Sequence, residues 1–251
     1  MDTEDAYMSE SFTFGIAELK IEVECRYDYI VKQCRDYMIT DGNNADMRVL
    51  ATDEAIENEH KLTPQMPKGY IESICVYREI AERLPRYGAA VFHGAAISYG
   101  DKAYIFTAPS GTGKSTHIKL WKQYLGDSVD IVNGDKPIIK RTASDMLVCS
   151  TPWAGKENWQ KNRIVPIGAI CILKRGKVNR IRKAEPSDVL DVLLGQIYMP
   201  KDGECAILSL EILDTLCERV PVYVLECDIS EEAVKTSFTA MTGEDYPEKQ
   251  I

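Results

Sequence analysis

The order of apolar and polar residues divides the chain into two parts. In the first part, residues 12–24 alternate near their end as a half-buried strand does, residues 29–38 fit a short helix, and residues 47–51 fit a strand. Residues 40–44 and 52–69 are rich in polar and turn-forming types, so we expect a turn and a surface loop there. Residues 70–84 have apolar side chains at helical spacing, and Pro85 and Gly88 end that helix. We therefore expect an N-terminal α/β region over residues 1–85.

The remainder of the chain, residues 86–251, alternates strands and helices more regularly. An apolar strand over 89–98 is followed by a two-residue hairpin turn at Gly100 and Asp101 and by a second strand over 102–107. We expect a helix to about Leu125, further strands at 129–133, 138–140, 146–149, 167–174 and 222–227, and helices at 187–197 and 205–219. Ser230 is placed to cap a last helix that ends near Met241. This mixture predicts the α/β class.

Composition excludes several classes of protein. The 251 residues carry 30 basic and 39 acidic side chains, a net charge of −9, without a cluster of Lys or Arg to follow a phosphate backbone. No apolar run approaches the roughly 18 residues of a spanning helix, and the acidic, polar start is the reverse of a signal peptide. The eight cysteines form no CxxC pair and mostly lie in apolar stretches, as reduced core cysteines do. We expect a cytoplasmic protein that binds neither nucleic acid nor membrane.

A phosphate-binding loop of the P-loop (Walker A) type follows the strand over 102–107. Its residues are Ala108, Pro109, Ser110, Gly111, Thr112, Gly113, Lys114 and Ser115, with Thr116 next, and Ala108 replaces the usual first glycine. Small residues let backbone N–H groups surround a phosphate, and the helix that starts near Lys114 adds its positive dipole end. Lys114 would reach the outer phosphates of a nucleotide, and the Ser115 hydroxyl would be a ligand of Mg²⁺.

A second acidic element of such an enzyme is expected at the end of the next strand. Asp135 stands there, just beyond residues 129–133. Its carboxylate could bind Mg²⁺ or accept the proton of an attacking hydroxyl. The alternative is an aspartate in an ordinary surface turn beside Gly134.

These residues resemble the catalytic core of the HPr kinase/phosphorylase family, which shares its fold with the phosphoenolpyruvate carboxykinases. The resemblance is carried by His93-Gly94 on the strand before the loop, by the hairpin at Gly100-Asp101, and by Thr116-His117 with Leu120-Trp121 after the lysine and serine. It implies an HPr kinase/PEP carboxykinase-like P-loop core with a β-hairpin feeding the phosphate loop. It also implies an ATP-dependent kinase that uses Mg²⁺, with His93 near the transferred phosphoryl group, and a possible homo-oligomer.

The departures from that family concern the metal and the acceptor. The family usually ends this strand with two adjacent aspartates, whereas this chain has Gly134-Asp135 or Asp135-Lys136, depending on the alignment. Residues 153–159 hold two tryptophans, Lys156 and Glu157, and do not match the family's arginine-rich loop, so phosphorylase activity is not expected. This segment could be a lid in which Glu157 is a second Mg²⁺ ligand, or it could be a buried corner with its tryptophans as packing.

The closer resemblance is to short stand-alone relatives, some of which phosphorylate a serine on peptides. Our first hypothesis is therefore a kinase that transfers the γ-phosphoryl group of ATP to Ser or Thr of a peptide or small protein, with Asp135, His93 and Lys114 as catalytic residues. A nucleotide-binding switch with little transfer activity and a kinase for a small molecule such as serine or a sugar are the alternatives. Residues 1–85 would be a substrate-docking lobe.

Overall fold

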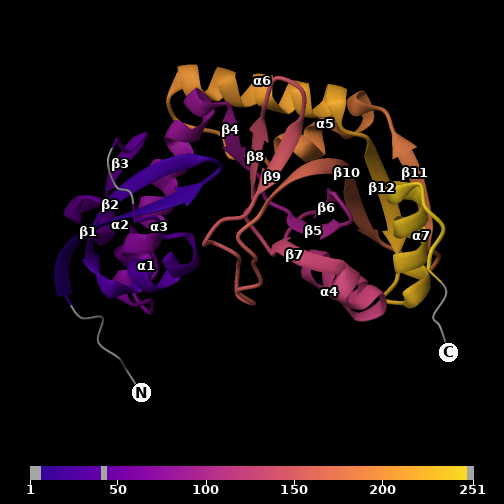
Figure 1. Ribbon diagram of the computed structural model, residues 1–251, viewed down its shortest axis with the longest axis horizontal. Helices are drawn as coiled ribbons and strands as arrows, with labels where there is room; N and C mark the ends of the chain where they lie inside the picture. Colours follow the sequence, from indigo (N-terminus) through magenta and orange to yellow (C-terminus); the bar gives the residue numbers. More distant parts are fainter. Residues whose placement is uncertain (1–6, 41–43, 248–251) are drawn as a thin grey trace.

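The structure, a computed structural model, describes residues 7–40 and 44–247 and has two β-sheets with helices packed against them (Figure 1). A three-stranded sheet with its helices forms the N-terminal region, and a nine-stranded sheet forms the rest. The α/β class is therefore confirmed. In these ranges no helix has both the length and the apolar character to cross a membrane.

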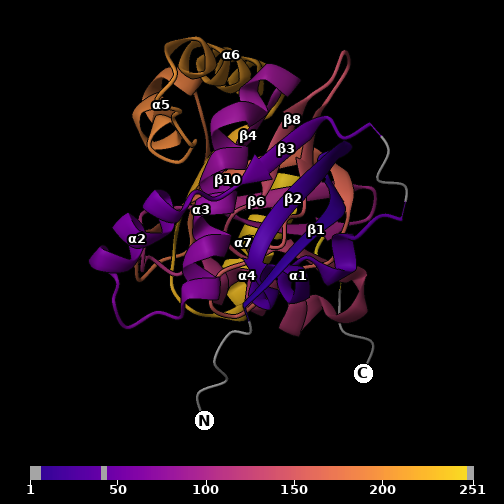
Figure 2. The same cartoon turned by 90° about the vertical axis from the view of Figure 1, so that its left-hand side faces the viewer.

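The N-terminal sheet has the order β1-β2-β3, with β1 and β2 antiparallel and β3 parallel to β2. Its elements, with two short 3₁₀ turns, are β1 (Tyr7–Ile16), β2 (Leu19–Tyr27), α1 (Asp28–Gln33), 3₁₀ (Arg35–Tyr37), β3 (Met47–Leu50), α2 (Asp53–Leu62), α3 (Lys68–Arg83) and 3₁₀ (Leu84–Tyr87). Figure 2 shows this sheet and α3 facing the viewer. The helix predicted over 70–84 and the strand predicted over 47–51 are confirmed.

Two predictions in this region are wrong. Residues 12–24 are not one strand but parts of a hairpin, because Ala17 and Glu18 form a tight turn with φ of 51° and 60°. Neither residue is a glycine or asparagine, so the sequence carries no turn signal there. Residues 52–69 contain α2 instead of a continuous loop: the Thr52 hydroxyl accepts a hydrogen bond from the Ala55 N–H and begins the helix.

The large sheet is organised by its long strand β10. Its strands are β4 (Ala89–Val91), β5 (Ala95–Tyr99), β6 (Lys102–Thr107), β7 (Val129–Asn133), β8 (Ile138–Arg141), β9 (Met146–Cys149), β10 (Ile164–Arg175), β11 (Arg180–Ala184) and β12 (Val222–Cys227). The order is β4-β8-β9-β10-β6-β5-β7, and β12 pairs with β10 and β11. The start of β10 pairs antiparallel to β9, and the remainder is parallel to both β6 and β12.

Helices cover both faces of this sheet, with α5 (Pro186–Leu194) and α6 (Gly203–Arg219) on one face and α4 (Lys114–Leu125) and α7 (Glu231–Thr242) on the other (Figure 1). The side chains of β6 alternate between the two cores. Ala103 and Ile105 pack with α5 and α6, whereas Tyr104 and Phe106 pack with α4 and α7. Burial on both faces explains why this strand is a continuous apolar run.

The prediction of one strand over 89–98 is wrong, because β4 and β5 pair with different partners. β4 is antiparallel to β8, and β5 is antiparallel to β6 and β7. The chain bends between them at His93 and Gly94. A strand at 180–184 (β11) was not predicted from the sequence.

All eight cysteines are free thiols, and six of them are buried, as the sequence predicted. Burial raises the pKa of Cys149 to about 12, so this thiol stays protonated and unreactive at neutral pH. These cysteines act as small apolar core residues.

The apolar core of the N-terminal region continues into the part of the chain that forms the nine-stranded sheet. The cluster that contains Phe14, Ile71 and Leu84 also contains Ile138 and Trp153. The boundary expected at residue 85 therefore coincides with a change of sheet but not with a break in packing, and the division into two domains stays a prediction.

Glu72 of α3 is a completely buried carboxylate that ties this helix to the end of β2. It accepts hydrogen bonds from the Arg26 N–H (2.8 Å) and the Tyr27 N–H (3.0 Å), and the Arg26 guanidinium lies 3.6 Å away. Burial raises the pKa of Glu72, and these hydrogen bonds act in the opposite direction. Its removal would leave two backbone donors unpaired at the start of α1.

Glu72→Ala should therefore lower the free energy of unfolding by about 3 kcal/mol, measured by urea denaturation. Glu79→Ala on the same helix is the control, because Glu79 is partly exposed and pairs only with Arg83 one turn away. The control should change stability by less than about 0.5 kcal/mol. Equal losses in the two variants would contradict the anchoring role of Glu72.

Candidate functional site

The predicted phosphate loop joins the end of β6 to the start of α4. Gly111 and Gly113 have φ of 77° and 122°, values that side-chain-bearing residues rarely adopt, although a Cβ would meet no atom within 4 Å at either position. The glycines are therefore required by backbone conformation and not by space. Pro109, Ser110, Ser115 and Thr116 are exposed, and Thr112 is partly buried.

Lys114 is a buried charged residue of the loop. Its ammonium group donates a hydrogen bond to the Ala108 carbonyl (3.0 Å) across the loop. Burial lowers the pKa of Lys114, and the negative charge of Asp135 acts in the opposite direction. The carboxylate therefore favours the charged amine that a phosphate needs.

His117 anchors the loop's helix to α7 instead of taking part in chemistry. Its Nε2 accepts a hydrogen bond from the Trp121 indole N–H (3.2 Å) and lies 3.1 Å from the Ser237 hydroxyl. All three side chains are buried.

His93 lies at the bend between β4 and β5 and is held from two sides. Its N–H donates to the Gln196 carbonyl (2.7 Å), and its carbonyl accepts from the Thr107 hydroxyl (2.8 Å) at the end of β6. Gly94 is required by close approach, since a Cβ there would lie 3.0 Å from the Ile105 side chain and 3.2 Å from the Phe106 carbonyl. His93 is thereby held beside the strand that leads into the phosphate loop.

Asp135 stands in a turn that a buried asparagine holds. The Asn133 side-chain oxygen accepts hydrogen bonds from the N–H groups of Asp135 (2.9 Å) and Lys136 (2.8 Å). Its amide donates to the Thr151 carbonyl (3.0 Å) and to the Thr151 hydroxyl (3.1 Å). The Gly94 N–H donates to the Asp135 carbonyl (3.0 Å), which joins this turn to the His93 bend.

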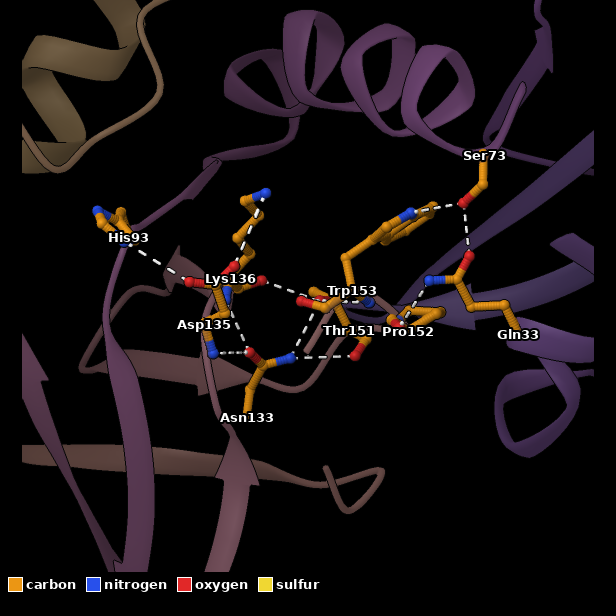
Figure 3. A network of polar contacts seen from close by, with 9 residues as sticks. All are labelled: Gln33, Ser73, His93, Asn133, Asp135, Lys136, Thr151, Pro152 and Trp153. Atoms are coloured by element: carbon orange, nitrogen blue, oxygen red, sulfur yellow. Dashed lines mark hydrogen bonds and ion pairs between the residues drawn. The ribbon is translucent and has the colours of Figure 1, made fainter. Parts of the chain in front are cut away.

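His93 and Lys136 lie on either side of the Asp135 carboxylate (Figure 3). The His93 Nε2 lies 3.6 Å from one carboxylate oxygen, and the Lys136 ammonium lies 3.7 Å from the other. Burial, and then the positive charge of Lys114, lower the pKa of His93. The imidazole is therefore neutral at pH 7, and Lys114 and Lys136 supply the positive charge near the carboxylate.

The segment 153–159 divides into a buried part and an exposed turn. Trp153 is 8% exposed, packs 5.3 Å from the Tyr77 ring, and donates its indole N–H to the Ser73 hydroxyl (3.0 Å). Trp153 is therefore packing, as the buried-corner alternative expects, while residues 155–158 are exposed and the lid alternative stays a prediction for them. Glu157 lies on the exposed turn beyond it, and its role as a Mg²⁺ ligand stays a prediction.

Gly155 lets this exposed turn approach the Asp135 side chain closely. A Cβ on Gly155 would lie 2.9 Å from the Asp135 Cβ, and its φ is 77°. The Gly134 N–H donates to the Trp159 carbonyl (2.9 Å). The segment therefore limits the positions open to the Asp135 side chain.

The N-terminal region also reaches this site, through residues that the sequence analysis did not single out. Ser73 donates to the Gln33 side-chain oxygen (2.5 Å), and Gln33 donates to the Pro152 carbonyl (3.1 Å), next to Thr151 (Figure 3). The Lys136 ammonium lies 5.3 Å from the centre of the Tyr77 ring. Burial, and then the charge of Asp135, raise the pKa of Tyr77. Asn133 at the end of a strand before Gly134 could have been found from the sequence, whereas Tyr77 carries no such signal.

The side-chain oxygen atoms of this site could hold Mg²⁺ only together with the oxygen atoms of a bound phosphate. Among the described residues no three His, Cys, Asp or Glu side chains are grouped so that they could hold a metal ion. Mg²⁺ is commonly held by one or two protein oxygens plus substrate phosphates and water. Ser115 and Asp135 supply a hydroxyl and a carboxylate of this kind.

Comparisons with known proteins add little to this picture. No model of a known protein family matches the chain, and no curated protein matches it. Among solved structures, the Hpr(Ser) kinase/phosphatase from Coxiella burnetii is similar to it with a TM-score of 0.36 and 12% identity, over 61% of this chain and 99% of that one. A similarity this weak carries no argument about activity, so function depends on the residues described above.

His117 predicts a pH dependence of stability. Burial lowers its pKa from 6.5 to about 4 in the folded chain. The unfolded chain therefore binds a proton below pH 6.5 that the folded chain does not bind until about pH 4, and stability falls as pH falls through this window. At pH 5 the loss is about 2 kcal/mol.

His117→Gln removes this group. Between pH 7 and pH 5, urea denaturation should show a loss of stability that is about 2 kcal/mol smaller in the variant than in the wild type. The quantity compared is the change in the free energy of unfolding between the two pH values within each protein. A lower stability of the variant at pH 7 therefore does not affect the comparison. An identical pH dependence in the two proteins would contradict the burial argument.

Proposed function

We propose that the protein is an ATP- and Mg²⁺-dependent kinase that transfers the γ-phosphoryl group to a hydroxyl, with Ser or Thr of a peptide or small protein as acceptor. The observation that carries the proposal is the placement of Lys114, His93 and Asp135 at one edge of the large sheet, close enough that the charge of Asp135 acts on the pKa values of both His93 and Lys114. A phosphate-loop lysine beside a carboxylate is the arrangement that phosphoryl transfer needs.

Each residue has a role that its surroundings support. The backbone of 109–115 and Lys114 would hold the β- and γ-phosphates, and Ser115 and Asp135 would hold the Mg²⁺ that balances their charge. The Asp135 carboxylate would orient the acceptor hydroxyl and accept its proton as the O–P bond forms and the bond to the leaving ADP breaks. A neutral His93 adds no further positive charge to the two lysines already near the carboxylate.

The acceptor would approach from the side of Asp135 that faces the N-terminal region. Tyr77 and Lys136 flank the carboxylate there. A groove of about 610 Å³ is lined by α2, α3 and residues 198–201, and it includes Arg78, the neighbour of Tyr77 on α3. A groove of this size admits an extended peptide segment, which favours a peptide over free serine or a sugar as acceptor.

The first test is binding of Mg²⁺ and ATP by isothermal titration. Lys114→Ala should weaken binding at least about 30-fold, since it removes a charge-assisted contact from a buried position. Lys119→Ala is the control, because Lys119 is on the same helix but exposed, and it should leave affinity unchanged. Failure of the wild-type protein to bind ATP would contradict the proposal.

The second test separates a kinase from a nucleotide-binding switch. Asp135→Asn keeps the shape of the side chain but removes the base, so transfer of labelled phosphate from ATP to a mixture of Ser- and Thr-containing peptides should fall at least about 100-fold. Its affinity for ATP measured without Mg²⁺ should stay within about threefold of the wild type, because the phosphate loop remains intact and only the metal ligand and base are changed. Wild-type ATP binding without transfer to any acceptor would favour the switch.

A further inference from the structure

A hollow of about 520 Å³ lies on the side of the phosphate loop opposite to Asp135. Its wall is made of the outer residues of the loop, the last residues of β10 and one residue of α5: Pro109, Ser110, Gly111, Thr112, Ile172, Leu173, Lys174, Arg175 and Val192. None of the residues in this wall is acidic. The mechanism proposed above does not use it.

The strand order fixes where this hollow lies relative to Asp135. Going along the sheet, the sequence of strands is β7, β5, β6, β10 and β12. Asn133 of β7 is level with Ala96 of β5, and Thr107 of β6 is level with Ile172 of β10. The ends that carry Asp135, His93, the phosphate loop and Arg175 therefore meet at one edge, with the loop between Asp135 and Arg175.

A nucleotide bound at this loop would have its phosphate chain oriented along the order of the strands. Its γ-phosphate must lie toward Asp135, where the acceptor hydroxyl would be oriented. The α-phosphate and the nucleoside must then extend toward β10, because neighbouring strands are only about 4.8 Å apart and the loop itself is filled by phosphates. The hollow is in that direction.

The wall of the hollow suits a nucleoside. Pro109 and Val192 offer apolar surface to the flat base, and Ile172 and Leu173 are nearly buried beneath it. The Arg175 guanidinium is held in place because it donates to the carbonyl of Gly111 and to that of Thr112 (3.3 Å). A guanidinium fixed in this way presents a planar cation on which an aromatic base can stack.

We propose that this hollow binds the base and ribose of the purine nucleotide whose phosphates occupy the loop. The proposal rests on the proposed function, and its test distinguishes the two. Arg175 joins the two sites, since it holds the loop's carbonyls on one side and faces the nucleoside on the other.

The experiment compares Mg²⁺-ATP with Mg²⁺-tripolyphosphate, which has the phosphate chain but no nucleoside, by isothermal titration. The wild-type protein should bind ATP at least about tenfold more tightly than tripolyphosphate. Val192→Gln replaces partly buried apolar surface by a neutral polar side chain, so it should weaken ATP binding about fivefold or more and leave tripolyphosphate binding within about twofold.

Leu194→Gln is the matched control. It makes the same change two positions along α5, where Leu194 is 40% exposed and outside the hollow, and it should leave both affinities unchanged. Equal affinity of the wild type for the two ligands, or an equal loss of both in Val192→Gln, would overturn the nucleoside site while leaving phosphate binding intact. Absence of binding by either ligand would overturn the proposed function and this site together.

Discussion

The buried side chain of Asn133 is the interaction on which the candidate site depends. One amide holds two backbone N–H groups of the Asp135 turn and two oxygen atoms of Thr151. Burying an amide costs free energy unless its donors and acceptor form hydrogen bonds. The oxygen and the amino group of the Asn133 side chain both do. The position of Asp135 is thereby coupled to the segment that carries Trp153 and, through Ser73 and Gln33, to the N-terminal region (Figure 3).

The strands of the large sheet bring the elements of the candidate site to one edge of the sheet, in a fixed order. Strands β6 and β10 are parallel, so their carboxyl ends lie at the same edge, and β5 and β7 bring the His93 bend and the Asp135 turn to that edge as well. Ligands of open α/β sheets bind outside the carboxyl ends of the strands. In this protein the proposed acceptor side and the proposed nucleoside side are separated by the phosphate loop.

The N-terminal region is part of the site as well as a neighbour of it. Trp153 is packed by Phe14 and Tyr77 of that region, and Tyr77 also faces the Lys136 ammonium. Aromatic packing of this kind stabilises a loop without making it rigid along its whole length. The turn that follows Trp153, which carries Glu157, is exposed.

The sequence by itself determined the elements whose signals are local. The glycines of the phosphate loop, the apolar strand before it, the cap at Ser230 and the helical spacing over 70–84 all depend on residues close together in the chain, so pattern and turn chemistry identified them. The same is true of Asp135, which could be placed after a strand. Its role stays a prediction.

Only the tertiary structure decided the features that depend on distant contacts. The bend at His93 and Gly94 arises because β4 and β5 pair with different strands, and the hairpin at Ala17 and Glu18 has no glycine to mark it. Trp153 is buried because an N-terminal helix that precedes it by about 80 residues in sequence supplies Ser73 and Tyr77. Such pairings lower the free energy only once the chain is folded, and no local propensity encodes them.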